Sequence, residues 1–465
     1  DFTFGNGFLV GVRERHGEGE AVNELVRLPL DGSEEAQVIA SGHDFFASPR
    51  LSPDGRSLCW LTWDHPDMPW NGTTLWLAEV DQRGMPGATR VVAGGRGEAI
   101  FQPEWSPDGR LHFASDRSGW WNLYRLEGTV ARLIAAVAGD AGVPQWVLRQ
   151  RRYAFLGDGA IAAVYASPSG TTLLVHETNG EVRALPAPGT WLAGPVAAGD
   201  VLCMLAGSPT AFPALVRVDP AGGEAQVLRA PDGPGLDPAL VSIPERVTFS
   251  TPDGPAYAYY YPPANPEFRA PAGDLPPLLV TIHGGPTSAA RPVLDPEVQF
   301  WTSRGFALAD VDYGGSTGYG RAYRQVLDGD WGIVDVDDCV AAARYLVLQL
   351  AYTTAFKHLA ILDVLCVALG FVLRVIAGAV AIPVEPTAWL LVCTFFLATF
   401  LGFAKRAGEA VRLGRSAGPA EGGRPVLIVY HDRLLLALLS TTCGLTLLSY
   451  ALYAIERHPY SPILL

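Results

Sequence analysis

The sequence is poor in charge and in the cysteine patterns that mark metal or redox sites. Only 17% of its 465 residues are charged, and its 6 cysteines form no Cys-x-x-Cys pair. Neither a zinc ribbon nor a dithiol redox motif is therefore expected. Runs of basic residues are also missing from the first 345 residues, which argues against nucleic-acid binding. The length excludes a small disulfide scaffold and leaves room for two to four domains.

Charge and hydrophobicity are distributed unevenly along the chain. The formal net charge is −13, but residues 346–465 hold 9 basic and 6 acidic residues, so the preceding part carries −16. The long apolar runs also lie in this last quarter. The averages therefore blend an acidic front with an apolar, membrane-like back. The sequence begins at Asp1 and shows no signal-peptide pattern.

A repeated turn organises residues 1–245. The segments LSPDGRSLCW (51–60) and WSPDGRLHFA (105–114) share a Ser-Pro-Asp-Gly turn, and these turns start 54 residues apart. Proline sets φ at the first corner, while Asp-Gly supplies a side-chain acceptor and a residue that tolerates positive φ. Strand-like runs, TTLWLAEV and WNLYRLEG, follow the two turns. A turn that recurs at this period indicates four-stranded blades, so we expect a partial β-propeller here.

Residues 246–346 have a different pattern. RVTFSTPDGPAYAYYYPP predicts a hairpin, and PPLLVTIHGGP and FALADVDYGGSTGYG predict two buried strands that end in glycine-rich loops. DVDDCVAAARYLV predicts a helix with one apolar face made by Val336, Val340, Ala343 and Val347. This alternation of strands, loops and a helix is the start of an α/β sheet.

Three apolar spans lie within residues 347–465, at about 359–382, 387–404 and 434–455. Each is close to the roughly 20 residues that a helix needs to cross a bilayer. A buried helix hairpin of a soluble protein is the alternative. The loop after the second span is rich in Arg and Lys, whereas the loop before it has neither. The positive-inside rule then predicts a multi-pass membrane protein whose N-terminal soluble part is cytoplasmic.

Four stretches of the first 346 residues resemble a known family. They are DHPDMPWNGTTLW (64–76), HGGP (283–286), DYGGSTGYG (312–320) and DWGIVDVDDCVAAARYL (330–346). On these motifs the front of the chain resembles the prolyl oligopeptidase family of serine peptidases, in its acylaminoacyl-peptidase-like and dipeptidyl-peptidase-like branch. The resemblance implies a propeller that screens peptide substrates, stacked on a truncated α/β-hydrolase domain that needs no cofactor. With the three C-terminal transmembrane α-helices, the expected fold is multidomain.

The glycines of HGGP are candidates for an oxyanion hole. A glycine pair at a strand end lets backbone N–H groups approach an oxyanion, and the resemblance assigns this role to the amides near Gly284 and Gly285. A plain tight turn is the alternative. Family members place a Gly-x-Ser-x-Gly elbow beyond the helix at 330–346, where this sequence departs from the family pattern. Two strings match that pattern. By the resemblance, the one around Ser316 lies in the family's loop before the helix and not in its elbow, and the one around Ser416 lacks the strand–turn–helix context. We therefore expect the Ser-Asp-His triad to be absent.

The last quarter resembles a second family. The segments at 351–382, 389–410 and 424–455 are similar to the C-terminal third of UbiA-type prenyltransferases, in the branch of decaprenyl-phosphate phosphoribosyltransferases. The resemblance implies a polyprenyl phosphate lipid as substrate, bound with Mg²⁺ at the cytoplasmic mouth of the helices. Charges inside membrane helices are costly and usually functional. The substrate-binding candidates are Lys357, Asp363, Lys405 and Arg406.

The proposed lipid site is incomplete in this sequence. Asp363 is its candidate metal ligand, but the Asp-rich motif of the family has no match, and one carboxylate cannot complete a Mg²⁺–diphosphate site. For Lys405 and Arg406, simple anchoring at the membrane surface is the alternative.

Three interpretations of the whole chain stay open. The first is a peptidase-family protein that lost its catalytic half and acts as a membrane-anchored, non-catalytic propeller binding module. The second is a membrane polyprenyl-phosphate transferase with a soluble extension. The third is a chimera of two gene fragments joined near 346–350, which is favoured because both families are interrupted within a domain and no flexible linker separates them. We therefore expect neither peptide hydrolysis nor prenyl transfer.

Overall fold

The computed structural model of the chain describes residues 1–465 except 234, 272–273, 286, 355–360, 382–385, 414–429, 431 and 458–465. The described chain forms two compact units. Unit 1 comprises residues 1–238, 283–296 and 315–329, and unit 2 comprises residues 239–282, 297–314 and 330–465.

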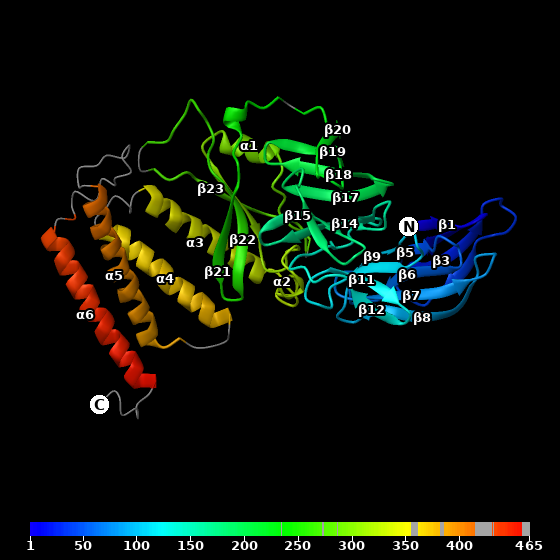
Figure 1. The fold of residues 1–465 in the computed structure, drawn as a ribbon, viewed down its shortest axis with the longest axis horizontal. Coiled ribbons are helices and arrows are strands. Elements are labelled where there is room, and N and C mark those ends of the chain that lie inside the picture. The colour runs from blue at the N-terminus through cyan, green and yellow to red at the C-terminus, as the bar shows by residue number, and fades with distance from the viewer. Residues whose placement is uncertain are drawn as a thin grey trace. The chain divides into compact units, whose positions relative to one another are not determined.

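Unit 1 contains, in its described residues, five four-stranded sheets in which strands that follow one another in sequence pair antiparallel (Figure 1). The strands are β1–β4 (Phe2–Phe4, Phe8–Arg15, Val22–Pro29, Gln37–Ala40), β5–β8 (Phe45–Leu51, Ser57–Trp63, Thr73–Val80, Pro86–Gly95), β9–β12 (Ile100–Trp105, Leu111–Ser115, Asn122–Glu127, Val130–Leu133), β13–β16 (Tyr153–Phe155, Ile161–Ser167, Gly170–His176, Val182–Leu185) and β17–β20 (Trp191–Ala198, Val201–Ser208, Ala211–Val218, Ala225–Arg229). The short helices η1 (Pro238–Leu240) and α2 (Arg321–Gln325) also begin in this unit.

The Ser-Pro-Asp-Gly turns occupy equivalent places in two neighbouring sheets. One joins β5 to β6 and the other joins β9 to β10. In the first, the Ser52 hydroxyl donates to Asp54 at 2.6 Å and accepts the Ser57 amide at 2.9 Å. Gly55 takes a φ of +68°, which a residue with a Cβ rarely adopts. The repeat in the sequence therefore corresponds to a repeat in the structure.

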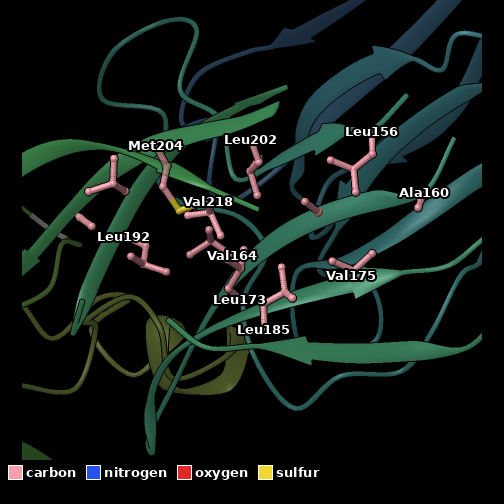
Figure 2. Packing of buried hydrophobic residues seen from close by; sticks show 13 residues of the cluster. Leu156, Ala160, Val164, Leu173, Val175, Leu185, Leu192, Leu202, Met204 and Val218 are labelled. Atoms are coloured by element: carbon pink, nitrogen blue, oxygen red, sulfur yellow. The ribbon is translucent and has the colours of Figure 1, made fainter. Parts of the chain in front are cut away.

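The cores of unit 1 lie between consecutive sheets. Figure 2 shows one such core, in which side chains of β14 and β15 face those of β17, β18 and β19. Further clusters join the first sheet to the second, the second to the third and the third to the fourth. Four-stranded sheets that pack face to face in chain order form a β-propeller. That the propeller is partial stays a prediction.

Unit 2 contains a mixed sheet of order β21-β22-β24-β23, formed by Glu245–Thr251, Gly254–Tyr261, Ala307–Asp312 and Leu278–Ile282. The hairpin β21–β22 is antiparallel, and β23 pairs with β24 in parallel. Helix α1 (Pro296–Thr302) lies between β23 and β24 in the chain. Among the described residues β23 is an edge strand, which leaves Val280 and Ile282 exposed.

Helix α3 (Val334–Thr354) packs on this sheet with a face other than the one predicted. The predicted face is wrong, because Val336, Val340 and Val347 are exposed. The buried residues are instead Val334, Asp338, Ala342 and Leu346. Both stripes have helical spacing, and the small side chain of Ala342 allows the close approach to the sheet that a valine would prevent. Periodicity alone therefore could not choose between them.

Three helices follow: α4 (Leu362–Ala381), α5 (Ala388–Leu413) and α6 (Asp432–Arg457). α5 packs against both α4 and α6. In the part of the chain that is described, two segments are long and apolar enough to cross a membrane, Ala388–Glu409 and Asp432–Ile455, rather than the three expected. The remaining expected span corresponds to α4, which carries Asp363 and Arg374 and whose flanking residues lie outside the described chain. Two such helices weakly suggest membrane association.

Candidate active site

The glycine loop that follows β23 belongs to unit 1 and presents exposed backbone. His283 is the first residue after the strand, and Gly284 and Gly285 are exposed. Gly285 has a φ of +75°, a conformation that favours glycine. Because neither glycine carries a side chain, a ligand can approach the backbone closely here, and the assignment of these amides to an oxyanion hole stays a prediction.

The ring of His283 is held by Ser316, which lies in the second glycine-rich segment. The Ser316 hydroxyl lies 2.7 Å from Nε2 of His283, and Nδ1 of that ring lies 3.3 Å from the Gly284 carbonyl oxygen. A proton on Nδ1 satisfies both contacts, since Nδ1–H then donates to the carbonyl and Nε2 accepts from the hydroxyl. Burial lowers the pKa of His283, so the neutral ring is favoured.

A serine hydroxyl on a neutral imidazole is the pairing that activates a nucleophile. Here, however, Ser316 has an exposed fraction of 0%. A nucleophile must reach a substrate carbonyl, and a fully enclosed hydroxyl cannot do so in this conformation. The pair therefore orients His283 and fixes the glycine loop.

Further hydrogen bonds join the glycine loop to the segment around Ser316. The Thr287 and Thr317 hydroxyls lie 2.6 Å apart, and the Thr317 amide donates to the Ser288 carbonyl at 2.7 Å. Thr287 is buried at 1% exposure. The two glycine-rich loops predicted from the sequence thus form one connected structure.

An ion cluster fixes the segment 315–329 within unit 1. The guanidinium of Arg324 donates to Asp116 at 2.5 Å and lies 3.9 Å from the ring centre of Trp121. Asp140 accepts the amides of Trp121 and Gly320 at 3.0 and 3.1 Å. Burial raises the pKa values of Asp116 and Asp140 and lowers that of Arg324, although the opposite charges partly offset this effect. The sequence offered no motif for this cluster, because its members come from distant segments.

The residues predicted for a lipid site are only partly described. Lys357 lies outside the described residues, and so does the side chain of Asp363, whose backbone belongs to α4. Lys405 and Arg406 are neighbours on α5, where Lys405 is exposed. Arg406 is buried and pairs with Glu409 at 2.8 Å. Among the residues that could be searched, no three His, Cys, Asp or Glu side chains are grouped to hold a metal ion.

The first comparisons with known proteins concern the family to which the chain belongs. The sequence model of the prolyl oligopeptidase family matches residues 292–361. A solved puromycin hydrolase is 32% identical, with a TM-score of 0.71, and the similarity covers 95% of this chain and 72% of that one. The chain belongs to the prolyl oligopeptidase family. A puromycin-hydrolyzing peptidase of Mycobacterium tuberculosis is also similar, at 37% identity and a TM-score of 0.67 over 73% of this chain and 53% of that chain. Members of the family normally need no cofactor.

A shorter stretch of the chain is similar to a different protein. Decaprenyl-phosphate phosphoribosyltransferase of Corynebacterium glutamicum is 30% identical over 117 residues, which are 25% of this chain and 34% of that protein. The chain therefore spans about a third of this relative and about half of the Mycobacterium tuberculosis peptidase.

Proposed function

We propose that this chain is a peptide-binding member of the prolyl oligopeptidase family that does not hydrolyse its ligand by itself. The observation that carries the proposal is the enclosure of Ser316, the serine that contacts His283 beside the glycine loop. Binding needs only the backbone N–H groups of the exposed residues Gly284 and Gly285, which can donate to a carbonyl oxygen of a peptide or an aminoacyl amide. Hydrolysis needs a nucleophile that can reach the carbonyl as well.

The course of α3 supports the same proposal. The resemblance places the nucleophile elbow after a further strand beyond the residue 330–346 helix. In this chain α3 continues without a break to Thr354, and α4 is the next described element. An uninterrupted α3 at this place in the chain supports a chain that binds peptides without a nucleophile elbow.

The test measures binding and hydrolysis separately on the purified full chain. We expect puromycin to bind in a calorimetric titration, and we expect no release of its amino acid on chromatography after long incubation. A puromycin hydrolase serves as the positive control. Hydrolysis by this chain that disappears in Ser316→Ala would overturn the proposal, because it would make Ser316 a nucleophile. Absence of binding would overturn the binding function.

A second candidate function concerns residues 347–465, and its specific support is the similarity to decaprenyl-phosphate phosphoribosyltransferases. We propose that this segment anchors the chain in a membrane, with the front of the chain in the cytoplasm, and contacts a polyprenyl phosphate. Lys357, Asp363, Lys405 and Arg406 would contact the phosphate, with Mg²⁺ at Asp363. The chain in proteoliposomes, given decaprenyl phosphate and phosphoribosyl diphosphate with Mg²⁺, is expected to bind the lipid without transferring a phosphoribosyl group; product formation would show a complete transferase.

The domain division and the origin of the chain form one further proposal. We infer a propeller at 1–245, the N-terminal part of a hydrolase domain at 246–346 and a membrane segment at 347–465. Similarity to two unrelated families within one chain supports a chimera of gene fragments. Sequencing genomic DNA across codons 340–355 in a fresh isolate tests this origin, since one continuous reading frame would contradict it.

A further inference from the structure

The glycine loop rests on a tryptophan of unit 1. Trp146 lies between β12 and β13, and its indole N–H donates to the Thr287 carbonyl oxygen at 2.8 Å. Its ring centre lies 4.4 Å from that of Trp70, at an angle of 44°. Trp70 is buried and belongs to the core between the third and fourth sheets. A chain of contacts therefore runs from the propeller core through Trp146 to the loop.

The loop is shaped to receive this indole. A Cβ placed on Gly285 would lie 2.8 Å from Cζ2 of Trp146, closer than real Cβ contacts allow. No atom lies within 4 Å of a Cβ built on Gly284. Gly285 is thus needed for close approach as well as for its positive φ, whereas Gly284 is not constrained by its surroundings.

Burial alone does not account for the position of Trp146. The side chain is 47% exposed, so much of its apolar surface stays in contact with water. Besides the ring contact with Trp70, it donates a hydrogen bond to Thr287 and approaches Gly285 so closely that a Cβ there would clash. Glycine-rich segments lose the most conformational entropy when they are ordered. Contacts on both sides of the loop, from Trp146 and from Thr317, offset that cost.

We propose that Trp146 is a positioning residue that holds the backbone N–H groups of Gly284 and Gly285 in the orientation in which they donate to the carbonyl oxygen of a ligand. The propeller thereby sets the geometry of the loop, because Trp146 packs in a tilted arrangement against the buried Trp70. The assignment of these amides to carbonyl binding rests on the proposed function, but the positioning itself does not.

Hydrogen exchange on the full chain tests the positioning role without a ligand. In Trp146→Ala, the amides of residues 283–285, 287 and 288 are expected to exchange roughly 10- to 30-fold faster, because a hydrogen bond and an aromatic contact are lost. Trp146→Phe keeps the ring but not the N–H donor, and it should restore part of the protection. Trp331→Ala, which removes a tryptophan that is 58% exposed, is the matched control and should leave this segment unchanged.

Two results would overturn the proposal. One is unchanged exchange of the loop in Trp146→Ala. The other is faster exchange throughout unit 1 in both Trp146 variants, which would show a general role in stability. Titration of puromycin separates this inference from the proposed function: if the wild-type chain binds none while Trp146→Ala still accelerates loop exchange, binding fails and positioning stands.

Discussion

The buried carboxyl group of Asp338 makes the stability of unit 2 depend on pH. Its side chain accepts the Gly314 amide at 2.7 Å and is 3% exposed. Burial raises the pKa of Asp338 from 3.8 to about 6; the Gly314 hydrogen bond opposes this shift, and the nearby Asp253 adds to it. An asparagine at this position can accept the same hydrogen bond without carrying a charge.

The sign and size of the effect follow from proton linkage. Below pH 3.8 the carboxyl group of Asp338 is protonated in both the folded and the unfolded chain, so it does not make the free energy of unfolding depend on pH. Between about pH 4 and pH 6 the unfolded state loses its proton first, and the free energy of unfolding falls as the pH rises. Above pH 6 the loss reaches about 3 kcal/mol, since each pKa unit corresponds to about 1.4 kcal/mol. Asp338→Asn should remove this loss and so stabilise unit 2 at pH 7.5.

The assay is urea unfolding of the full chain in detergent, followed by tryptophan fluorescence and far-ultraviolet circular dichroism at pH 4, 5.5 and 7.5. The wild type and Asp338→Asn should differ little at pH 4 and increasingly at the higher values. Glu267→Gln is the control, because Glu267 is an exposed carboxylate of unit 2 that does not contribute to the pKa shift of Asp338. A variant that is less stable than wild type at pH 7.5 would refute the reasoning, since it would show that the ionised carboxylate is stabilising.

Three further perturbations probe unit 1. Arg324→Met removes the closer of the two guanidinium groups beside the buried Asp116 and leaves Arg321 at 3.6 Å. It should lower the free energy of unfolding by about 3 kcal/mol, the lower end for a broken buried pair; a loss below about 1 kcal/mol in urea unfolding would contradict this. Gly285→Ala should cost about 2 kcal/mol because of its positive φ and the contact with Trp146, whereas Gly284→Ala should change the urea midpoint little. Burial lowers the pKa of His112 to about 4. As the pH falls below 6.5, the unfolded state therefore binds the proton first, and the free energy of unfolding decreases by up to about 3 kcal/mol towards pH 4. His112→Gln should flatten the dependence of the melting temperature on pH, and an unchanged slope would argue against a neutral buried ring.

Local chemistry made much of the fold predictable from the sequence. The Ser-Pro-Asp-Gly turns depend on a proline, a capping carboxylate and a glycine within four residues, so each turn is specified where it stands. The strands at 278–282 and 307–312 were likewise marked by short apolar runs that end at glycines. Helix α3 was predicted as a helix, but its buried face was not. Which face is buried depends on the packing of Ala342 against the sheet, and no local sequence pattern predicts this contact.

The candidate site was predictable only in part. The glycine loop was visible as a motif, and its assignment to an oxyanion hole stays a prediction. The contact of Ser316 with His283 joins two motifs that the sequence analysis treated separately. Trp146 meets Thr287 across 141 positions and belongs to no motif, so only the folded chain brings it to the loop. Long-range pairings of this kind leave no periodic signal in a single sequence.

The open edge of unit 2 has a consequence for the behaviour of the protein in solution. β23 offers unpaired backbone groups along Leu278–Ile282 in the described structure, flanked by exposed Val280 and Ile282 and without a charged side chain in the strand. Natural sheets protect such edges with lysine, proline or a covering segment, because extended chains add to them readily. These five backbone positions are therefore a place where a second extended chain can add, and no charged side chain of the strand opposes it.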